Sequence, residues 1–214
     1  MSVTRHPPGE VPQTCVPGDF FLVCDWTEDL LGKLIRAGER TRFGNTDYAR
    51  WSHSGMIETA DGGIIEANQP GIQRANISEY RDADLYVVDV GQPTDRRALA
   101  VGFAGLQVGK KYDVLDFVAL AFQCIFGVDL SLHEDRRFIC SGLVSRATEK
   151  YIDAYPRSQE AMMPADLAAY WNATSGQPLP KLGFFDRLLN LVAAIGRIVT
   201  FRDPVKPQST TTER

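Results

Sequence analysis

The sequence predicts an α+β protein in which an antiparallel sheet packs against helices. Short apolar runs bounded by turn residues, including an Asp-Gly hairpin signal, recur up to about residue 90. Apolar residues at helical spacing dominate from residue 94 onward. The 214 residues suit one domain with its own core, and 44% hydrophobic with 23% charged residues is a globular composition.

Charge and cysteine usage narrow the classes of function. The net charge of −4 argues against nucleic acid as a partner, because no basic stripe is present to neutralise phosphates. The four cysteines are irregularly spaced and form no CxxC pair, so the sequence predicts neither a zinc site nor a cofactor.

The first elements are a buried strand and a helix. Pro17-Gly18-Asp19 predicts a turn into a strand at Phe20–Cys24, after an arm over residues 1–16 that we expect to be flexible. Thr27 is placed to cap a helix with an apolar face. Residues 38–48 are polar with glycine and arginine, which predicts an exposed loop.

A hairpin follows this loop. Asp61-Gly62 is a two-residue turn signal between strands predicted at residues 54–59 and 63–67. In that register His53 and Glu66 share one face, but Glu66 pairs with Ile57, roughly 13 Å along the strand from His53. Contact between them would require a bulge, a slipped pairing or a bent strand.

The remaining elements alternate between short strands and helices. Strands are predicted at residues 71–73 and 85–90, with a helical turn near residues 78–80 between them. Helices are predicted from Thr94 to Gly109, over residues 113–126, and from Pro164, a residue well placed at a first helical position.

The segment with the strongest chemical signal is Phe138-Ile139-Cys140-Ser141-Gly142-Leu143-Val144. Apolar residues at helical spacing after Cys140 place this cysteine in the first turn of a helix. Unpaired N–H groups and the positive end of the helix dipole favour a thiolate there. The small residues Ser141 and Gly142 leave room for a substrate beside the sulfur.

A thiolate nucleophile also needs a base and a group that orients the base. His53, within Trp51-Ser52-His53-Ser54-Gly55-Met56-Ile57, offers an imidazole, and Glu66 offers a carboxylate on the next strand. These residues predict a Cys140–His53–Glu66 triad. Each residue also has a structural interpretation: a small buried hydrophobe, a histidine with a structural role and an ordinary strand residue.

Two motifs resemble those of a known superfamily. Cys140-Ser141-Gly142-Leu143-Val144 is similar to the nucleophile motif of NlpC-like peptidases, and the segment around His53 resembles their histidine strand. Papain-like enzymes usually run cysteine then histidine. Histidine first, after a Pro-Gly-Asp turn, resembles the circularly permuted branch, which includes lecithin:retinol acyltransferase relatives. The resemblance covers roughly residues 17–170 and implies a permuted papain-like fold.

The resemblance also implies roles. It implies a cysteine peptidase or amidase in which Cys140 is the nucleophile, His53 the base and Glu66 the orienting group, with a thioester intermediate. Peptides, peptidoglycan-type amides or lipid esters are the implied substrates, and Tyr112 is implied to line their pocket. The acyltransferases typically have Glu-His after the cysteine, whereas Ser141-Gly142 stands here. This difference favours amide hydrolysis over lipid acyl transfer.

Two other functions stay open beside acyl transfer. A viral chymotrypsin-like cysteine protease also runs histidine, acid, cysteine, but it should be almost all β. A non-catalytic module of the same fold would bind a peptide or a lipid headgroup. Two further motifs are rejected: Ser141 lacks a Gly-x-Ser-x-Gly elbow, and residues 104–111 lack the first glycine and final Ser/Thr of a phosphate loop.

The predicted organisation is a catalytic domain over residues 17–175, an apolar helical extension over 176–201 and a disordered tail over 202–214. Charged residues interrupt the apolar extension, so we expect it to cover the domain, with peripheral membrane contact or a partner helix as alternatives. The N-terminal residues carry no secretory signal, which predicts a cytoplasmic protein. A phage-delivered or membrane-peripheral role would also fit.

Overall fold

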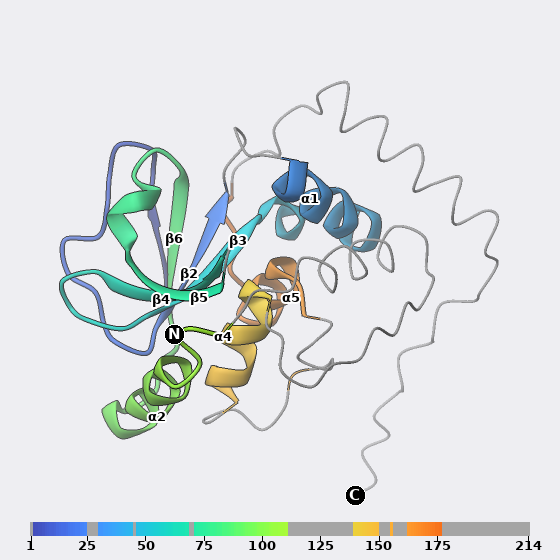
Figure 1. The fold of residues 1–214 in the computed structure, drawn as a ribbon. Coiled ribbons are helices and arrows are strands. Elements are labelled where there is room, and N and C mark those ends of the chain that lie inside the picture. The colour runs from blue at the N-terminus through green and yellow to red at the C-terminus, as the bar shows by residue number, and fades with distance from the viewer. Residues whose placement is uncertain are drawn as a thin grey trace, which may run out of the picture.

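The computed structural model describes residues 2–24, 30–44, 46–68, 71–110, 139–149, 155 and 162–176. These residues form an antiparallel sheet with helices packed against it (Figure 1). The structure therefore confirms the predicted α+β class.

The sheet has six strands in the order β1-β6-β2-β3-β4-β5, and every neighbouring pair is antiparallel. The strands are β1 (Ser2–His6), β2 (Phe20–Cys24), β3 (His53–Ile57), β4 (Gly63–Asn68), β5 (Gly71–Asn76) and β6 (Asp84–Asp89). Strand β2 lies between β6 and β3, so the first predicted strand is central in the sheet.

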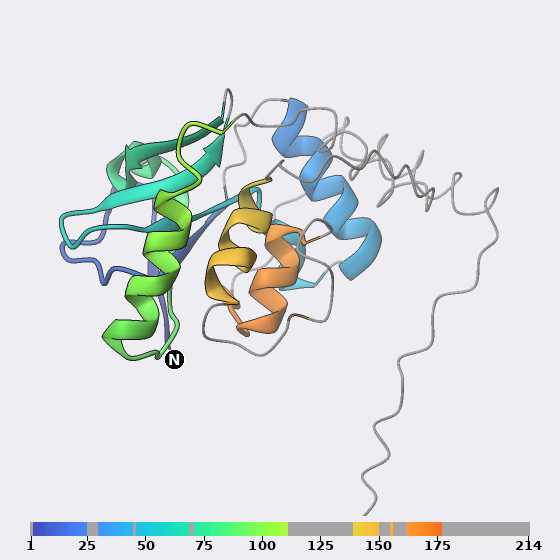
Figure 2. The ribbon, with the colours of Figure 1, turned by 60° about the horizontal axis from the view of Figure 1, so that its bottom comes forward.

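The helices gather on one side of this sheet. They are α1 (Leu30–Phe43), α2 (Thr94–Gly105), α4 (Cys140–Thr148) and α5 (Pro164–Tyr170). There are also two 3-10 turns in the described residues, η1 (Asp47–Arg50) and η2 (Ile77–Tyr80), and η2 packs with Phe21 on the other face of the sheet. Helix α4 packs between α2 and α5, and α1 packs against η1 (Figure 2).

Both faces of the sheet are covered, which explains the continuous apolar run of β2. Phe20 and Leu22 contact a cluster that includes Val144 of α4 and Trp171 beside α5. Phe21 belongs to a second cluster on the opposite face. A strand buried on both faces needs apolar residues at every position rather than at alternate ones.

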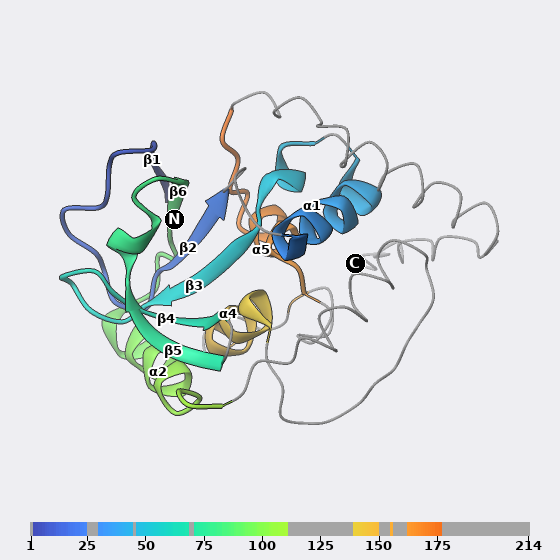
Figure 3. The ribbon, with the colours of Figure 1, turned by 45° about the horizontal axis from the view of Figure 1, so that its top comes forward.

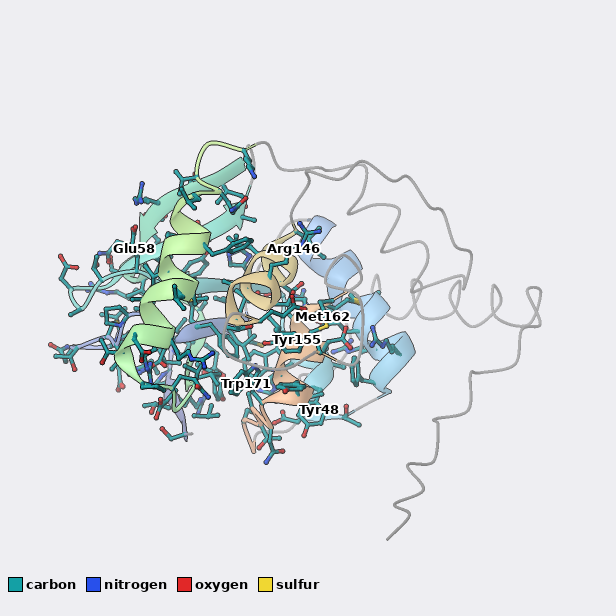
Figure 4. All side chains as sticks on the ribbon, turned by 90° about the horizontal axis from the view of Figure 1, so that it is seen from below. Tyr48, Glu58, Arg146, Tyr155, Met162 and Trp171 are labelled. Atoms are coloured by element: carbon teal, nitrogen blue, oxygen red, sulfur yellow. The ribbon has the colours of Figure 1, made fainter. Side chains whose placement is uncertain are left out.

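Helix α5 is anchored by a small polar network inside the first cluster. The indole Nε1 of Trp171 donates to the Tyr155 hydroxyl at 3.0 Å, and this hydroxyl also hydrogen-bonds Thr148 Oγ1 at 2.5 Å (Figure 4). The network joins the end of α4 to the end of α5. The two helices are thereby linked to each other at these ends.

The N-terminal segment differs from the expected flexible arm. Ser2–His6 form β1, which pairs with β6 from Ser2↔Asp89 to His6↔Leu85. Arg5 Nε also donates to Asp84 Oδ1 at 2.8 Å. The expectation was wrong over these residues because β6 offers a free edge whose backbone groups the polar N-terminal segment satisfies.

Residues 38–48 do not form the expected exposed loop. Helix α1 continues to Phe43, and Glu39 within it is completely buried. Glu39 Oε1 accepts the Ala165 N–H at 2.8 Å, and the Arg42 guanidinium binds the Asp166 carboxylate. The prediction was wrong because residues of α5 bind both side chains: Asp166 pairs with Arg42, and the Ala165 N–H reaches one oxygen of Glu39, so their polarity does not imply exposure.

Several predictions concern residues that the structure does not describe. They include Thr27 as a helix cap, Tyr112, the helix over residues 113–126, and nearly all of the C-terminal extension and tail. Among the described residues, no helix combines the length and apolar character needed to cross a membrane.

Candidate active site

Helix α4 begins at Cys140, as the sequence predicted. Ile139 before it is extended, and the Cys140 residue is 3% exposed. The helix rests on the sheet through Leu143 and Val144, both fully buried. Ser141 Oγ donates to the Met162 carbonyl at 2.5 Å, which ties the first turn of α4 to the residues before α5. The start of α4 is therefore fixed from both sides.

The sheet opens where α4 meets it. Strands β3 and β4 pair only from Gly55↔Glu66 to Ile57↔Ile64, although β3 starts at His53 and β4 continues to Asn68. Helix α4 packs against both strands (Figure 3). His53, the first residue of β3, thus lies next to Cys140, the first residue of α4.

The hairpin register explains how Glu66 reaches His53. The predicted pairing of Glu66 with Ile57 is wrong, because Glu66 pairs with Gly55. The loop is longer than two residues: the N–H groups of Glu58 and Thr59 both donate to the Gly63 carbonyl. Glu66 therefore lies diagonally across from His53 on the same face, a spacing that long side chains bridge.

The His53–Glu66 contact is direct. His53 Nε2 lies 2.9 Å from Glu66 Oε2, and the side chain of His53 is 15% exposed against 1% for Glu66. Because Nε2 contacts Glu66, Nδ1 is the ring nitrogen left for the Cys140 sulfur, which hydrogen-bonds the imidazole. One ring thus joins the carboxylate to the thiol.

Two more side chains hold the Glu66 carboxylate. The Tyr80 hydroxyl donates to Oε2, and Gln73 Nε2 donates to Oε1 at 3.0 Å. Burial raises the pKa of Glu66, but the hydrogen bond and charge of His53, with the bonds from Tyr80 and Gln73, lower it to about 2. Glu66 is therefore an anion at neutral pH.

The electrostatics favour a thiolate–imidazolium pair. Burial opposes ionisation of Cys140, yet the hydrogen bond and charge of His53 outweigh it and lower the pKa of the thiol. Burial likewise lowers the pKa of His53, but Cys140 and Glu66 together raise it to about 10. Each partner stabilises the charged form of the other.

A backbone donor completes the surroundings of the sulfur. Ile57 N–H donates to the Asp19 carbonyl of the chain entering β2, so odd residues of β3 pair toward β2. The Ser54 N–H therefore points toward β4, where the ladder has already ended. It hydrogen-bonds the Cys140 sulfur instead, as does the Ser141 N–H.

Gly55 in the histidine strand has a packing role. A Cβ at this position would lie 2.6 Å from two ring atoms of Phe21, closer than side chains tolerate. The Phe21 ring uses this space and contacts both the His53 ring, at 6.2 Å between centroids, and the Tyr80 ring, at 5.4 Å. The absence of a side chain at Gly55 therefore lets the Phe21 ring pack beside the imidazole.

The structure brings together Cys140, His53 and Glu66, three of the four residues singled out from the sequence. The fourth, Tyr112, lies outside the described residues. Tyr80, Gln73 and the Ser54 N–H were not anticipated. Gln73 lies directly opposite Glu66, because the ladder of β4 and β5 starts at Asn68↔Gly71; a two-residue loop after Asn68 would have predicted this pairing.

The described residues contain no group of three or more histidine, cysteine, aspartate or glutamate side chains arranged to hold a metal ion. The site therefore consists of a buried cysteine, an imidazole and a carboxylate, placed where strands β3 and β4 separate in the antiparallel sheet. A scan against protein-family models finds no match, and a search of curated proteins finds no related sequence.

Proposed function

We propose that this protein is a thiol hydrolase that cleaves an amide or ester bond. The observation that carries the proposal is the imidazole of His53, held by the Glu66 anion on one side and hydrogen-bonded to a helix-terminal cysteine on the other. A structural cysteine needs no such partners. A nucleophile needs all of them, because ionisation and a positioned proton are what the chemistry requires.

In the first half-reaction the Cys140 thiolate attacks the carbonyl carbon of the substrate. The Nδ1–H of His53 then donates its proton to the leaving nitrogen or oxygen, and the bond from carbon to that atom breaks. A thioester on Cys140 remains, and His53 is neutral. Glu66 stabilises the imidazolium before this step and keeps Nε2 protonated throughout.

In the second half-reaction neutral His53 takes a proton from water. The resulting hydroxide attacks the thioester carbon, the C–S bond breaks, and the acid product leaves. The thiolate–imidazolium pair is then restored with no net change in the enzyme. Transfer to another acceptor would use the same thioester with a different nucleophile.

Two features support assigning the chain to the circularly permuted papain-like superfamily. The histidine strand precedes the nucleophile helix in the chain, and the helix packs against the antiparallel sheet that carries the histidine. The resemblance of the Cys140 segment to NlpC-like motifs favours peptide-like amides as substrates over lipid esters. Ser141 supports this preference, since its hydroxyl is engaged by Met162 and its position lacks the acyltransferase glutamate.

The first test is the pH dependence of Cys140 alkylation by iodoacetamide, in wild type and in His53→Ala. Mass spectrometry separates Cys140 from Cys15, Cys24 and Cys124. We expect rapid alkylation well below the ordinary thiol pKa of about 8.5, and a marked slowing in the variant. A wild-type profile with an ordinary thiol pKa, unchanged by His53→Ala, would refute a hydrolase and leave a binding module.

A further inference from the structure

Tyr80 stands out among the residues that the sequence did not connect with the site. It is the last residue of η2, whose start is fixed by a capping box: Asn76 accepts the Ser78 N–H at 3.0 Å, and Glu79 accepts the Asn76 N–H at 3.3 Å. The Ile77 N–H also donates to the Gly62 carbonyl. The backbone that carries Tyr80 is therefore anchored to the β3–β4 hairpin.

Tyr80 contacts both members of the His53–Glu66 pair. Its ring stacks on the imidazole, with centroids 5.5 Å apart and planes at 27°. Its hydroxyl donates to Glu66 Oε2, the same oxygen that His53 Nε2 contacts. The Phe21 ring contacts both the Tyr80 ring and the His53 ring, which restricts the motion of the Tyr80 ring.

These contacts restrain two separate motions. Glutamate has three side-chain torsions, so a carboxylate held only by His53 could rotate Oε2 away from the ring; the Tyr80 hydroxyl opposes this rotation. A half-turn of the imidazole would move Nδ1 away from Cys140, and the stacked Tyr80 ring opposes that rotation. The distance between the Cys140 sulfur and the imidazole depends on the rotation of the Glu66 carboxylate and on the rotation of the His53 ring.

We propose that Tyr80 is a positioning residue, which fixes the Glu66 oxygen and the plane of the His53 ring so that Nδ1 stays directed at Cys140. This inference rests on the proposed function. Gln73 has a smaller positioning role. It binds Oε1, the oxygen that does not contact His53, and this hydrogen bond does not restrain the plane of the His53 ring.

The test compares Tyr80→Phe with a matched control. Phenylalanine keeps the stacked ring and removes only the hydroxyl. Tyr48→Phe removes a hydroxyl that donates to Asn172 at 3.0 Å, beside α5 (Figure 4). Circular dichroism and thermal melting establish that each variant folds, and the iodoacetamide pH profile of Cys140 is then measured for all three proteins.

We expect the acid limb of the Tyr80→Phe profile to move upward by half to one pH unit, which slows alkylation at pH 6 by about threefold to tenfold. Tyr48→Phe should keep the wild-type profile. Gln73→Leu should move the limb in the same direction by less, and it tests the network if Tyr80→Phe does not fold.

Proton NMR gives a second readout that a merely structural role would not move. A strongly downfield signal from the His53 Nε2 proton should be present in wild type, absent in His53→Ala, and broadened or lost in Tyr80→Phe. A wild-type pH profile and a sharp signal in Tyr80→Phe would overturn the inference. An ordinary thiol pKa in wild type itself would instead refute the proposed function, so the two failures are distinguishable.

Discussion

Two buried glutamates, Glu66 on β4 and Glu39 on α1, have pKa values that are shifted in opposite directions. Glu66 is 1% exposed and Glu39 is 0% exposed, and burial is the largest influence on the pKa of both. The pKa of Glu66 is nevertheless lowered to about 2, whereas that of Glu39 is raised well above its ordinary value.

The partners account for this difference. Glu66 is bound by His53, which becomes a cation, and by the donors of Tyr80 and Gln73. Glu39 Oε1 accepts a single backbone N–H, and within the described part of the chain its Oε2 accepts no hydrogen bond. The negative charges of Asp166 and Cys140 add to the effect of burial on the pKa of Glu39, and the Ala165 N–H and the positive charge of Arg36 oppose it without outweighing it. Equal burial therefore leaves the carboxyl pKa low where a cation and several donors converge, and raised where they do not.

The largest expected effect comes from removing the Glu66 anion. Glu66→Gln keeps the shape of the side chain but cannot stabilise an imidazolium by charge. We expect the acid limb of Cys140 alkylation to rise by about two pH units, which slows the reaction at pH 6 by about a hundredfold. The iodoacetamide profile measures this shift, and a profile identical to wild type would show that Glu66 does not support the pair.

The second prediction concerns Glu39, whose pKa is shifted in the opposite direction to that of Glu66. A carboxyl whose pKa is raised in the folded state contributes its full stability below the unfolded pKa of about 4.3, and this contribution is lost as the pH rises toward the folded pKa. Glu39→Gln mimics the neutral acid at every pH. The variant should therefore gain stability over wild type as the pH rises from about 4.3 to 7, by at most about 1.4 kcal/mol per pH unit.

Urea denaturation at a series of pH values measures this gain, and the alkylation profile of the variant provides the control. Because the raised pKa of Glu39 favours the protonated carboxyl, which glutamine resembles, Glu39→Gln should leave the acid limb of the Cys140 profile unchanged. A constant stability difference between pH 4.3 and 7 would mean that Glu39 is ionised in the folded protein, and the comparison with Glu66 would fail.

The parts of the site that could be predicted from sequence depend on local pattern. The strand at Phe20–Cys24 and the helix start at Cys140 follow from turn residues and apolar spacing alone. The shared face of His53 and Glu66 follows from strand parity, which survives a register error of two residues. Their contact does not follow, because the length of the loop after Ile57 decides it.

The parts that could not be predicted depend on long-range pairing. Nothing near Tyr80 in the sequence indicates that η2 passes beside His53, since the placement results from the order of β3, β4 and β5 in the sheet. The Ser54 N–H becomes available only because the β3–β4 ladder ends one residue away. The polar sequence of α1 predicts exposure, because the partners of Glu39 and Arg42 on α5 lie more than a hundred residues further along the chain.

The smallest expected effect tests whether the cluster around Glu39 acts on stability alone. The Arg42 guanidinium binds both oxygens of Asp166, and Asp166 also accepts the Met163 N–H at 2.9 Å, so this pair joins the end of α1 to the start of α5. Arg42→Lys keeps the positive charge and loses the two-pronged geometry. We expect a loss of about 1 kcal/mol in the free energy of unfolding, measured by urea denaturation.

The alkylation profile decides how far this effect extends. The start of α5 is connected to the start of α4 through the Ser141 hydroxyl and the Met162 carbonyl, which is a contact between neutral groups. This hydrogen bond fixes the position of the helix start but does not change the electrostatic potential at the Cys140 sulfur. Arg42→Lys should therefore lower stability and leave the acid limb of the Cys140 alkylation profile unchanged. A shift of that limb without a loss of stability would show that the charges beside α5 act directly on the thiolate, and that the two carboxylate clusters form one electrostatic unit.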